Sequence, residues 1–142
     1  HQNELGKIAN LFNRDGGPTP PIGISVPQAM YDDFVEICKP VKNINPDFPF
    51  EVKVAKPRKR PTSTGGTDAS VFAVEGVPTY GFTTDDIKGY NFSYGEIWHT
   101  ERDLYTKNIP EYQEHTAVVT AIVALGVANL DKQLSREGMY KE

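Results

Sequence analysis

Hydrophobic and polar positions change from strand-like to helix-like patterns several times along the 142-residue chain. Residues 7–14 form a mainly apolar run that ends in a Gly-Gly-Pro turn, which predicts a buried strand. Residues 50–55 alternate between apolar and polar side chains, as a strand with one buried face does. Residues 77–82 predict a third strand. Residues 16–23 and 83–108 predict loops, and the second is long enough for a functional role to be expected.

Helical spacing predicts the elements between and after these strands. Ser25 and Gln28, with a proline between them, match a capping box and predict a helix that Pro40 ends. The apolar residues that recur at helical spacing within it are Met30, Phe34, Ile37 and Cys38. Residues 68–75 predict a short helix closed by a glycine. A long helix is predicted to begin near Pro110. Its expected buried stripe consists of Ala117, Ala121, Ile122, Leu125, Ala128 and Leu130.

The alternation of strands and helices predicts an α/β sandwich, and the chain length suits one domain over residues 1–142. The composition, 38% hydrophobic and 24% charged, is that of an ordinary globular protein. No apolar run approaches the roughly 20 residues of a membrane span. A net charge of −4 argues against a nucleic-acid binder. We interpret the basic residues 56–61, flanked by prolines, as a solvated loop.

Cys38 is the only cysteine, so the chain can form neither an internal disulfide nor a thiolate zinc cluster. Its place among the apolar positions of the first predicted helix indicates a small buried side chain. His115, near the start of the last helix, is expected at the surface.

Two residues far apart in the sequence could bind a metal. Asp15 follows the predicted strand 7–14, where ligands of α/β sheets gather, and Asp is a zinc ligand. Asp15 could also simply cap the turn after it. His99 lies in the long loop, where an imidazole can reach a metal while a carboxylate such as Asp103 fixes its tautomer. Alternatively, His99 is an exposed histidine without a role.

Three short segments, taken in order, resemble the C-terminal half of the co-catalytic dizinc exopeptidases. This family includes bacterial leucyl aminopeptidase, aminopeptidase Y and carboxypeptidase Q. The resemblance extends from Lys7 to about Leu134. The segments are Asn13-Arg14-Asp15-Gly16-Gly17, Gly65-Gly66-Thr67-Asp68 and Trp98-His99-Thr100-x-x-Asp103.

The resemblance implies a three-layer α/β/α sandwich of the zinc-exopeptidase type, present here as a C-terminal partial domain. It implies that Asp15 and His99 are metal ligands in a site that holds two zinc ions in the complete enzyme and hydrolyses peptide substrates. It also implies a substrate pocket, lined by Gly66, Thr67, Asp68 and Trp98. Two positions depart from the family pattern. Trp98 stands where Tyr or His is most common before the ligand, and Ala69 stands where a His follows the Asp.

Other parts of the family's catalytic machinery are missing from this sequence. No His-x-Asp element and no Glu-Glu pair occurs in the chain, so no residue is assigned as catalytic. We therefore expect a hydrolase, a zinc metalloprotease of the amino- or carboxypeptidase type, whose N-terminal half is absent here. The 142 residues alone are expected to be inactive and to bind zinc weakly. A periplasmic or secreted parent would fit this expectation.

Two other functions stay open: a non-catalytic binding or scaffolding module of the same fold, and a glutaminyl-cyclase-like acyltransferase with a single zinc. In each metal-binding case, Asp15 and His99 should converge at one end of the sheet. An unpaired edge at the predicted strand 7–14 would favour self-association, and a monomer with a protected edge is the alternative.

Overall fold

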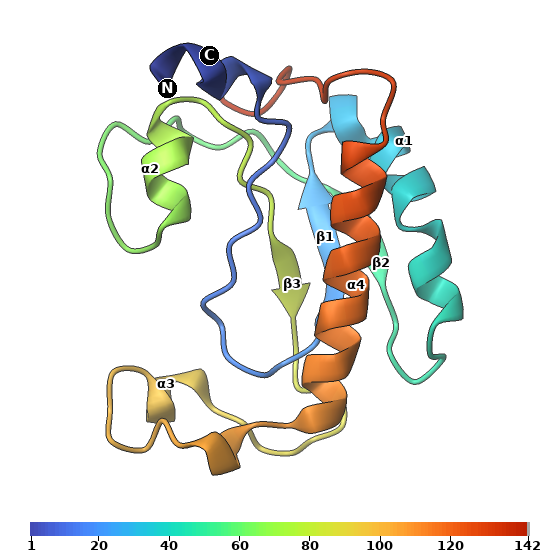
Figure 1. Ribbon diagram of the computed structural model, residues 1–142, viewed down its shortest axis with the longest axis vertical. Helices are drawn as coiled ribbons and strands as arrows, with labels where there is room; N and C mark the ends of the chain where they lie inside the picture. The colour runs from blue at the N-terminus through green and yellow to red at the C-terminus, as the bar shows by residue number, and fades with distance from the viewer. Residues whose placement is uncertain (142) are drawn as a thin grey trace.

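A three-stranded mixed sheet forms the centre of the computed structural model, which describes residues 1–141 (Figure 1). Strand β1 (Pro21–Val26) lies between β2 (Glu51–Val54), to which it is parallel, and β3 (Phe82–Thr84), to which it is antiparallel. Together with the helices around it, this sheet confirms the predicted mixed α/β class.

Two long helices accompany the sheet. Helices α1 (Gln28–Ile37) and α4 (Pro110–Ala128) pack against each other and against β1, while α2 (Ala69–Val74) and α3 (Tyr94–Ile97) lie on the far side of the molecule from α1 (Figure 1). The 3-10 helices are Gln2–Lys7, Lys39–Asn43 and Tyr105–Lys107. None of the helices in residues 1–141 has both the length and the apolar character needed to cross a membrane.

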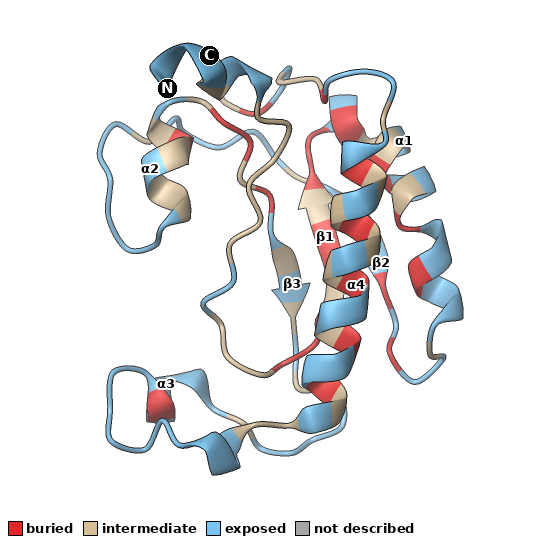
Figure 2. Ribbon diagram, in the orientation of Figure 1, coloured by how far each residue is buried: buried red, intermediate tan, exposed pale blue. Residues whose placement is uncertain are grey.

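The hydrophobic core lies between the sheet and the two long helices (Figure 2). Helix α1 contributes Met30 and Phe34, one turn apart, as its helical spacing predicted. Cys38, one turn further, is also buried, and this burial raises the pKa of its thiol to about 12. The prediction of a small buried side chain at Cys38 is therefore confirmed.

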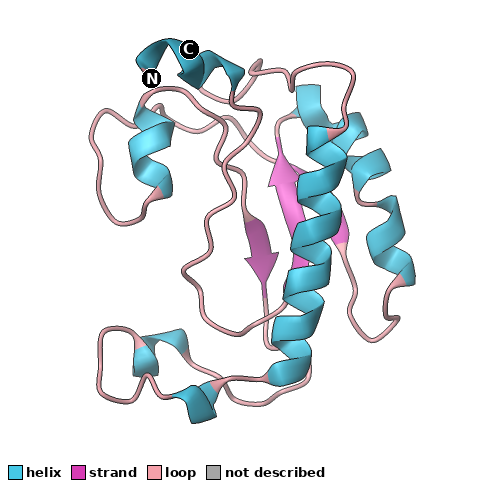
Figure 3. Ribbon diagram, viewed as in Figure 1, coloured by secondary structure: helices cyan, strands magenta, loops and turns pink. Residues whose placement is uncertain are grey.

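The predicted strand over residues 7–14 is wrong. Residues 8–13 run as an extended loop beside residues 78–82 (Figure 3). The side chain of Asn10 replaces a strand ladder there: its amide donates to the Tyr80 carbonyl at 3.0 Å and accepts from the Tyr80 N–H at 2.9 Å. Because residues 7–14 form no strand, the edge that was expected to drive self-association is absent at this place, and self-association itself stays a prediction.

Strand β1 occupies a segment predicted as a loop followed by a helix cap. Ser25 lies within the strand, and α1 begins after Pro27 with no side-chain cap, so the capping-box prediction is wrong. Burial outweighs the local signals, since Ile24 is 1% and Val26 0% exposed. Gly23 permits this pairing, because a Cβ at its position would lie 2.4 Å from the Glu51 carbonyl oxygen of β2.

The other predicted elements are found with shifted limits. Strand β2 and helices α2 and α4 match their predicted segments closely. Strand β3 begins only at Phe82, at the end of the segment predicted as a strand, and the loop over residues 83–108 contains α3.

The buried face of α4 differs from the predicted stripe, and Leu125 of that stripe is 62% exposed. A Cβ on Gly126 would lie 2.6 Å from the Ile37 side chain, so α4 presents a residue without a side chain to the end of α1. The helix therefore turns the Gly126 side, and not Leu125, towards α1. The buried residues of α4 are Tyr112, His115, Val119, Val123 and Val127.

His115 is buried, contrary to the expectation of a surface position. It is 5% exposed and stacks on Phe48 with ring centroids 4.2 Å apart. Its Nε2 has no hydrogen-bond partner among residues 1–141. Desolvation by burial therefore lowers the pKa of His115 below its ordinary value of 6.5.

This histidine makes stability depend on pH. Below about pH 6.5 the unfolded chain takes up a proton that the folded chain excludes, so the free energy of unfolding should fall as the pH drops through this range. Above this pH the contribution is fully retained. His115→Leu should flatten the dependence, whereas His1→Asn should not. Urea unfolding between about pH 5 and 8 measures the free energy of unfolding at each pH. If this free energy fell with pH as steeply in His115→Leu as in the wild type, the buried histidine would not be the source of the pH dependence.

Candidate functional site

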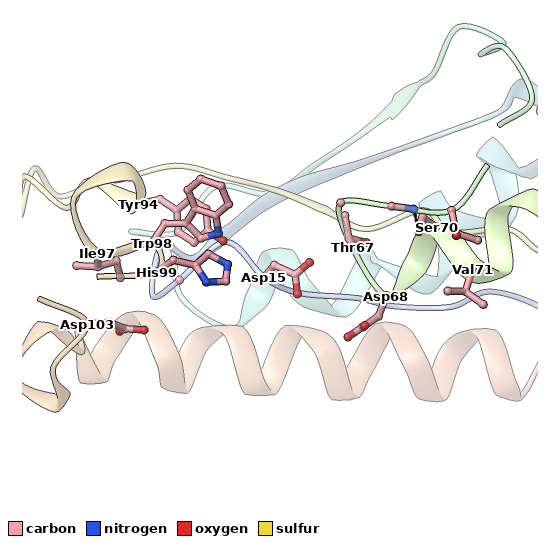
Figure 4. Close-up of a pocket in the computed structure, with 14 residues that line it drawn as sticks. Asp15, Thr67, Asp68, Ser70, Val71, Tyr94, Ile97, Trp98, His99 and Asp103 are labelled. Carbon is pink, nitrogen blue, oxygen red and sulfur yellow. Dashed lines mark hydrogen bonds between the residues drawn. The ribbon is translucent and has the colours of Figure 1, made fainter. Parts of the chain in front are cut away.

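A cavity of about 820 Å³ lies between α2, α3 and the loop that follows residue 14 (Figure 4). It gathers side chains and backbone from three segments that are far apart in the sequence. The imidazole of His99 and the carboxylate of Asp15 project into the same space (Figure 4). The residues singled out from the sequence all line this cavity: Asp15, Gly66, Thr67, Asp68, Trp98 and His99.

Asp15 stands on a tight loop that its neighbour Arg14 holds in shape. The Arg14 guanidinium donates to the carbonyl oxygens of Gly17, at 2.6 Å, and of Thr19. These bonds fold the chain back between residues 14 and 19 and leave the Asp15 side chain exposed to the cavity. The Asn13 side-chain amide donates to Oδ2 of Asp15 at 2.7 Å.

His99 stands on a turn directly after the short helix α3. Its φ of 54° lies in the left-handed region, which few residues other than glycine adopt and which functional sites often contain. Thr100 closes the turn, since its hydroxyl lies 3.1 Å from the Glu96 carbonyl oxygen and 3.0 Å from that of Ile97. The Trp98 ring lies edge-on to the imidazole, with centroids 4.8 Å apart. The Trp-His-Thr motif therefore builds the turn that presents the histidine.

Gly17 allows the Asp15 loop to approach the loop that carries His99. Its φ is +72°, and a Cβ at its position would lie 2.7 Å from Cζ of Phe92 and 3.6 Å from the Tyr94 ring. Only glycine adopts this φ without strain and also leaves room for the Phe92 ring. The sequence pattern suggested a turn at Gly17, but it gave no sign that Phe92 would be its partner.

Asp86 anchors the chain between β3 and α3. Its carboxylate accepts from the Tyr112 hydroxyl at 2.8 Å and from the backbone amides of Tyr90 and Phe92 at 3.1 and 3.3 Å. Desolvation alone would raise the pKa of Asp86, but these hydrogen bonds lower it below its ordinary value. Sequence reasoning assigned no role to Asp86, because its main partner lies 26 residues away on α4.

The glycine pair and Thr67 shape the opposite wall. Gly66 has a φ of +81°, and the Gly65 amide donates to the Ser70 hydroxyl at 2.8 Å. The Thr67 hydroxyl accepts from the Ala69 amide at 3.0 Å at the start of α2. Asp68 follows, and its carboxylate lines the cavity (Figure 4). This wall is built by local turns rather than by contacts with the sheet.

The cavity combines carboxylates with an apolar wall. Asp68 and Asp103 line it together with the Asp15 and His99 pair, and no Lys or Arg of residues 1–141 does so. Its apolar side chains are Val71, Tyr94, Ile97 and Trp98. One carboxylate and one imidazole are a donor set that suits zinc. Among residues 1–141, however, no three His, Cys, Asp or Glu side chains are grouped closely enough to hold a metal ion.

The chain was compared with models of protein families, with curated proteins and with solved structures, and none of these matches it. The candidate site therefore depends on its geometry and on the sequence motifs that line it.

Proposed function

We propose that this chain supplies part of the metal site and of the substrate pocket of a zinc-dependent exopeptidase, a hydrolase of peptide bonds. One observation carries the proposal: the three motif segments, separated by long stretches of chain, line a single cavity. As part of this proposal, the mixed sheet belongs to a larger three-layer α/β/α sandwich, which chain outside the 142 residues completes.

In this proposal Asp15 offers a carboxylate oxygen and His99 an imidazole nitrogen to zinc. Protein zinc sites usually have three or four protein ligands, so the remaining ligands come from outside the 142 residues. Bound zinc would activate a water molecule and polarise the carbonyl of the peptide bond to be cleaved. The Trp98 side of the cavity would hold an apolar side chain of the substrate, and Gly66, Thr67 and Asp68 would form the facing wall.

Calorimetric titration of the pure chain with zinc tests the ligand assignment. We expect one site no tighter than about micromolar, because two ligands hold the metal less firmly than the usual three or four. Asp15→Asn and His99→Asn should each weaken binding at least about tenfold. His1→Asn is the matched control, since it removes another exposed histidine, whose side chain is 96% exposed.

Two results would contradict the proposed function. Zinc binding that is equal in the wild type, Asp15→Asn and His99→Asn would contradict the ligand assignment. Steady hydrolysis of leucine p-nitroanilide by the pure chain would contradict the need for residues outside it.

A further inference from the structure

We propose that Asn13 is a positioning residue that fixes the Asp15 carboxylate, an inference that depends on the proposed metal role of Asp15. The Asn13 Nδ2 donates to Oδ2 of Asp15 at 2.7 Å and lies 3.4 Å from the Thr67 hydroxyl. An ionised carboxylate only accepts hydrogen bonds, so the amide must present its NH₂ group to Asp15. One carboxylate oxygen is thereby held, and the other stays available to a metal.

The need for such a partner follows from the position of Asp15. Its side chain is exposed at the tip of a loop, where a carboxylate would otherwise sample several rotamers. Partners that hydrogen-bond a metal-binding carboxylate restrict it in this way, and their loss typically weakens metal binding by about 10- to 100-fold.

Asn13 is itself held by the fold. It ends the segment that docks along residues 78–82 through Asn10, and its carbonyl oxygen lies 3.5 Å from the position of a Cβ on Gly81. Because the docked segment holds the half-buried Asn13 in place, its hydrogen bond can restrict the exposed Asp15 side chain. Through Thr67 it also links the ligand to the opposite wall of the cavity.

The primary test needs no metal. NMR three-bond couplings report whether the Asp15 χ1 angle occupies one rotamer, and we expect a single rotamer in the wild type and averaged couplings in Asn13→Ala. Asn129→Ala is the matched control: it removes the same kind of side chain at an exposed position at the end of α4, outside the cavity lining, and should leave the Asp15 couplings unaveraged. Zinc titration is the second readout, and we expect about tenfold weaker binding in Asn13→Ala at an unchanged melting temperature.

The possible outcomes separate this inference from the proposed function. Averaged Asp15 couplings already in the wild type, or unaveraged couplings in Asn13→Ala, would overturn the positioning role whether or not zinc binds. Zinc binding that survives in Asp15→Asn would instead overturn the proposed function. Zinc binding lost in Asp15→Asn but unchanged in Asn13→Ala would overturn the positioning role alone.

Discussion

Replacing Phe34 by alanine should lower the free energy of unfolding by about 3–5 kcal/mol. The Phe34 ring is 0% exposed and belongs to the hydrophobic cluster that joins β1, α1 and α4. Its removal would leave a cavity at the contact between the sheet and both long helices. Urea unfolding followed by circular dichroism measures the change.

The neighbouring Val35 provides the matched control, because it lies on the same helix but is 37% exposed. Val35→Ala should change stability by no more than about 0.5 kcal/mol. Equal effects of the two substitutions would mean that α1 does not face the sheet as described.

Replacing Gly17 by alanine should lower the free energy of unfolding by about 2–6 kcal/mol and separate the two loops of the candidate site. The new side chain would be strained at a φ of +72° and would overlap the Phe92 ring, and each of these effects costs roughly 1–3 kcal/mol. Unfolding measurements give the cost. Loss of the nuclear Overhauser contacts between residue 17 and the Phe92 ring would report the separation, together with shifted amide signals around His99.

Gly16→Ala is the control for this substitution, because a Cβ at Gly16 would meet no atom within 4 Å and its φ is not in the left-handed region. We expect a change within about 0.5 kcal/mol and unmoved His99 signals. If Gly17→Ala behaved like Gly16→Ala, the Gly17–Phe92 contact would not be what brings the Asp15 and His99 loops together.

The fold was predictable where local pattern and tertiary packing agree. Helix α1 was expected from the spacing of Met30 and Phe34, and α4 from its start near Pro110. Strand β1 was missed because its prolines and Ser25 favour a loop and a cap, while the burial of its apolar side chains depends on strands that lie elsewhere in the sequence. The strand predicted over residues 7–14 was wrong because a contact distant in the sequence replaces it. The Asn10 side chain, within that run, makes the hydrogen bonds to Tyr80 that backbone groups would make in a strand.

The candidate site was predictable as far as its motifs extend. Asp15 and His99 stand in recognisable segments, and so do the residues of the two walls. The residues that hold these segments together carry no local signal. The role of Phe92 depends on its contact with Gly17, and that of Asp86 on its hydrogen bond with Tyr112. Because both partners are distant in the sequence, these roles can be recognised only in the folded structure.

The proposed function depends most on Asp15 and His99 binding the same metal ion. Titration of the isotope-labelled chain with a paramagnetic divalent ion such as Co²⁺, followed by NMR, locates the ion directly, even when binding is weak. We expect the strongest broadening at Asp15 and His99, weaker broadening at Gly66 and Thr67, and loss of the whole pattern in His99→Asn. Broadening centred on His1 alone, or broadening at Asp15 that persists in His99→Asn, would contradict a shared metal site.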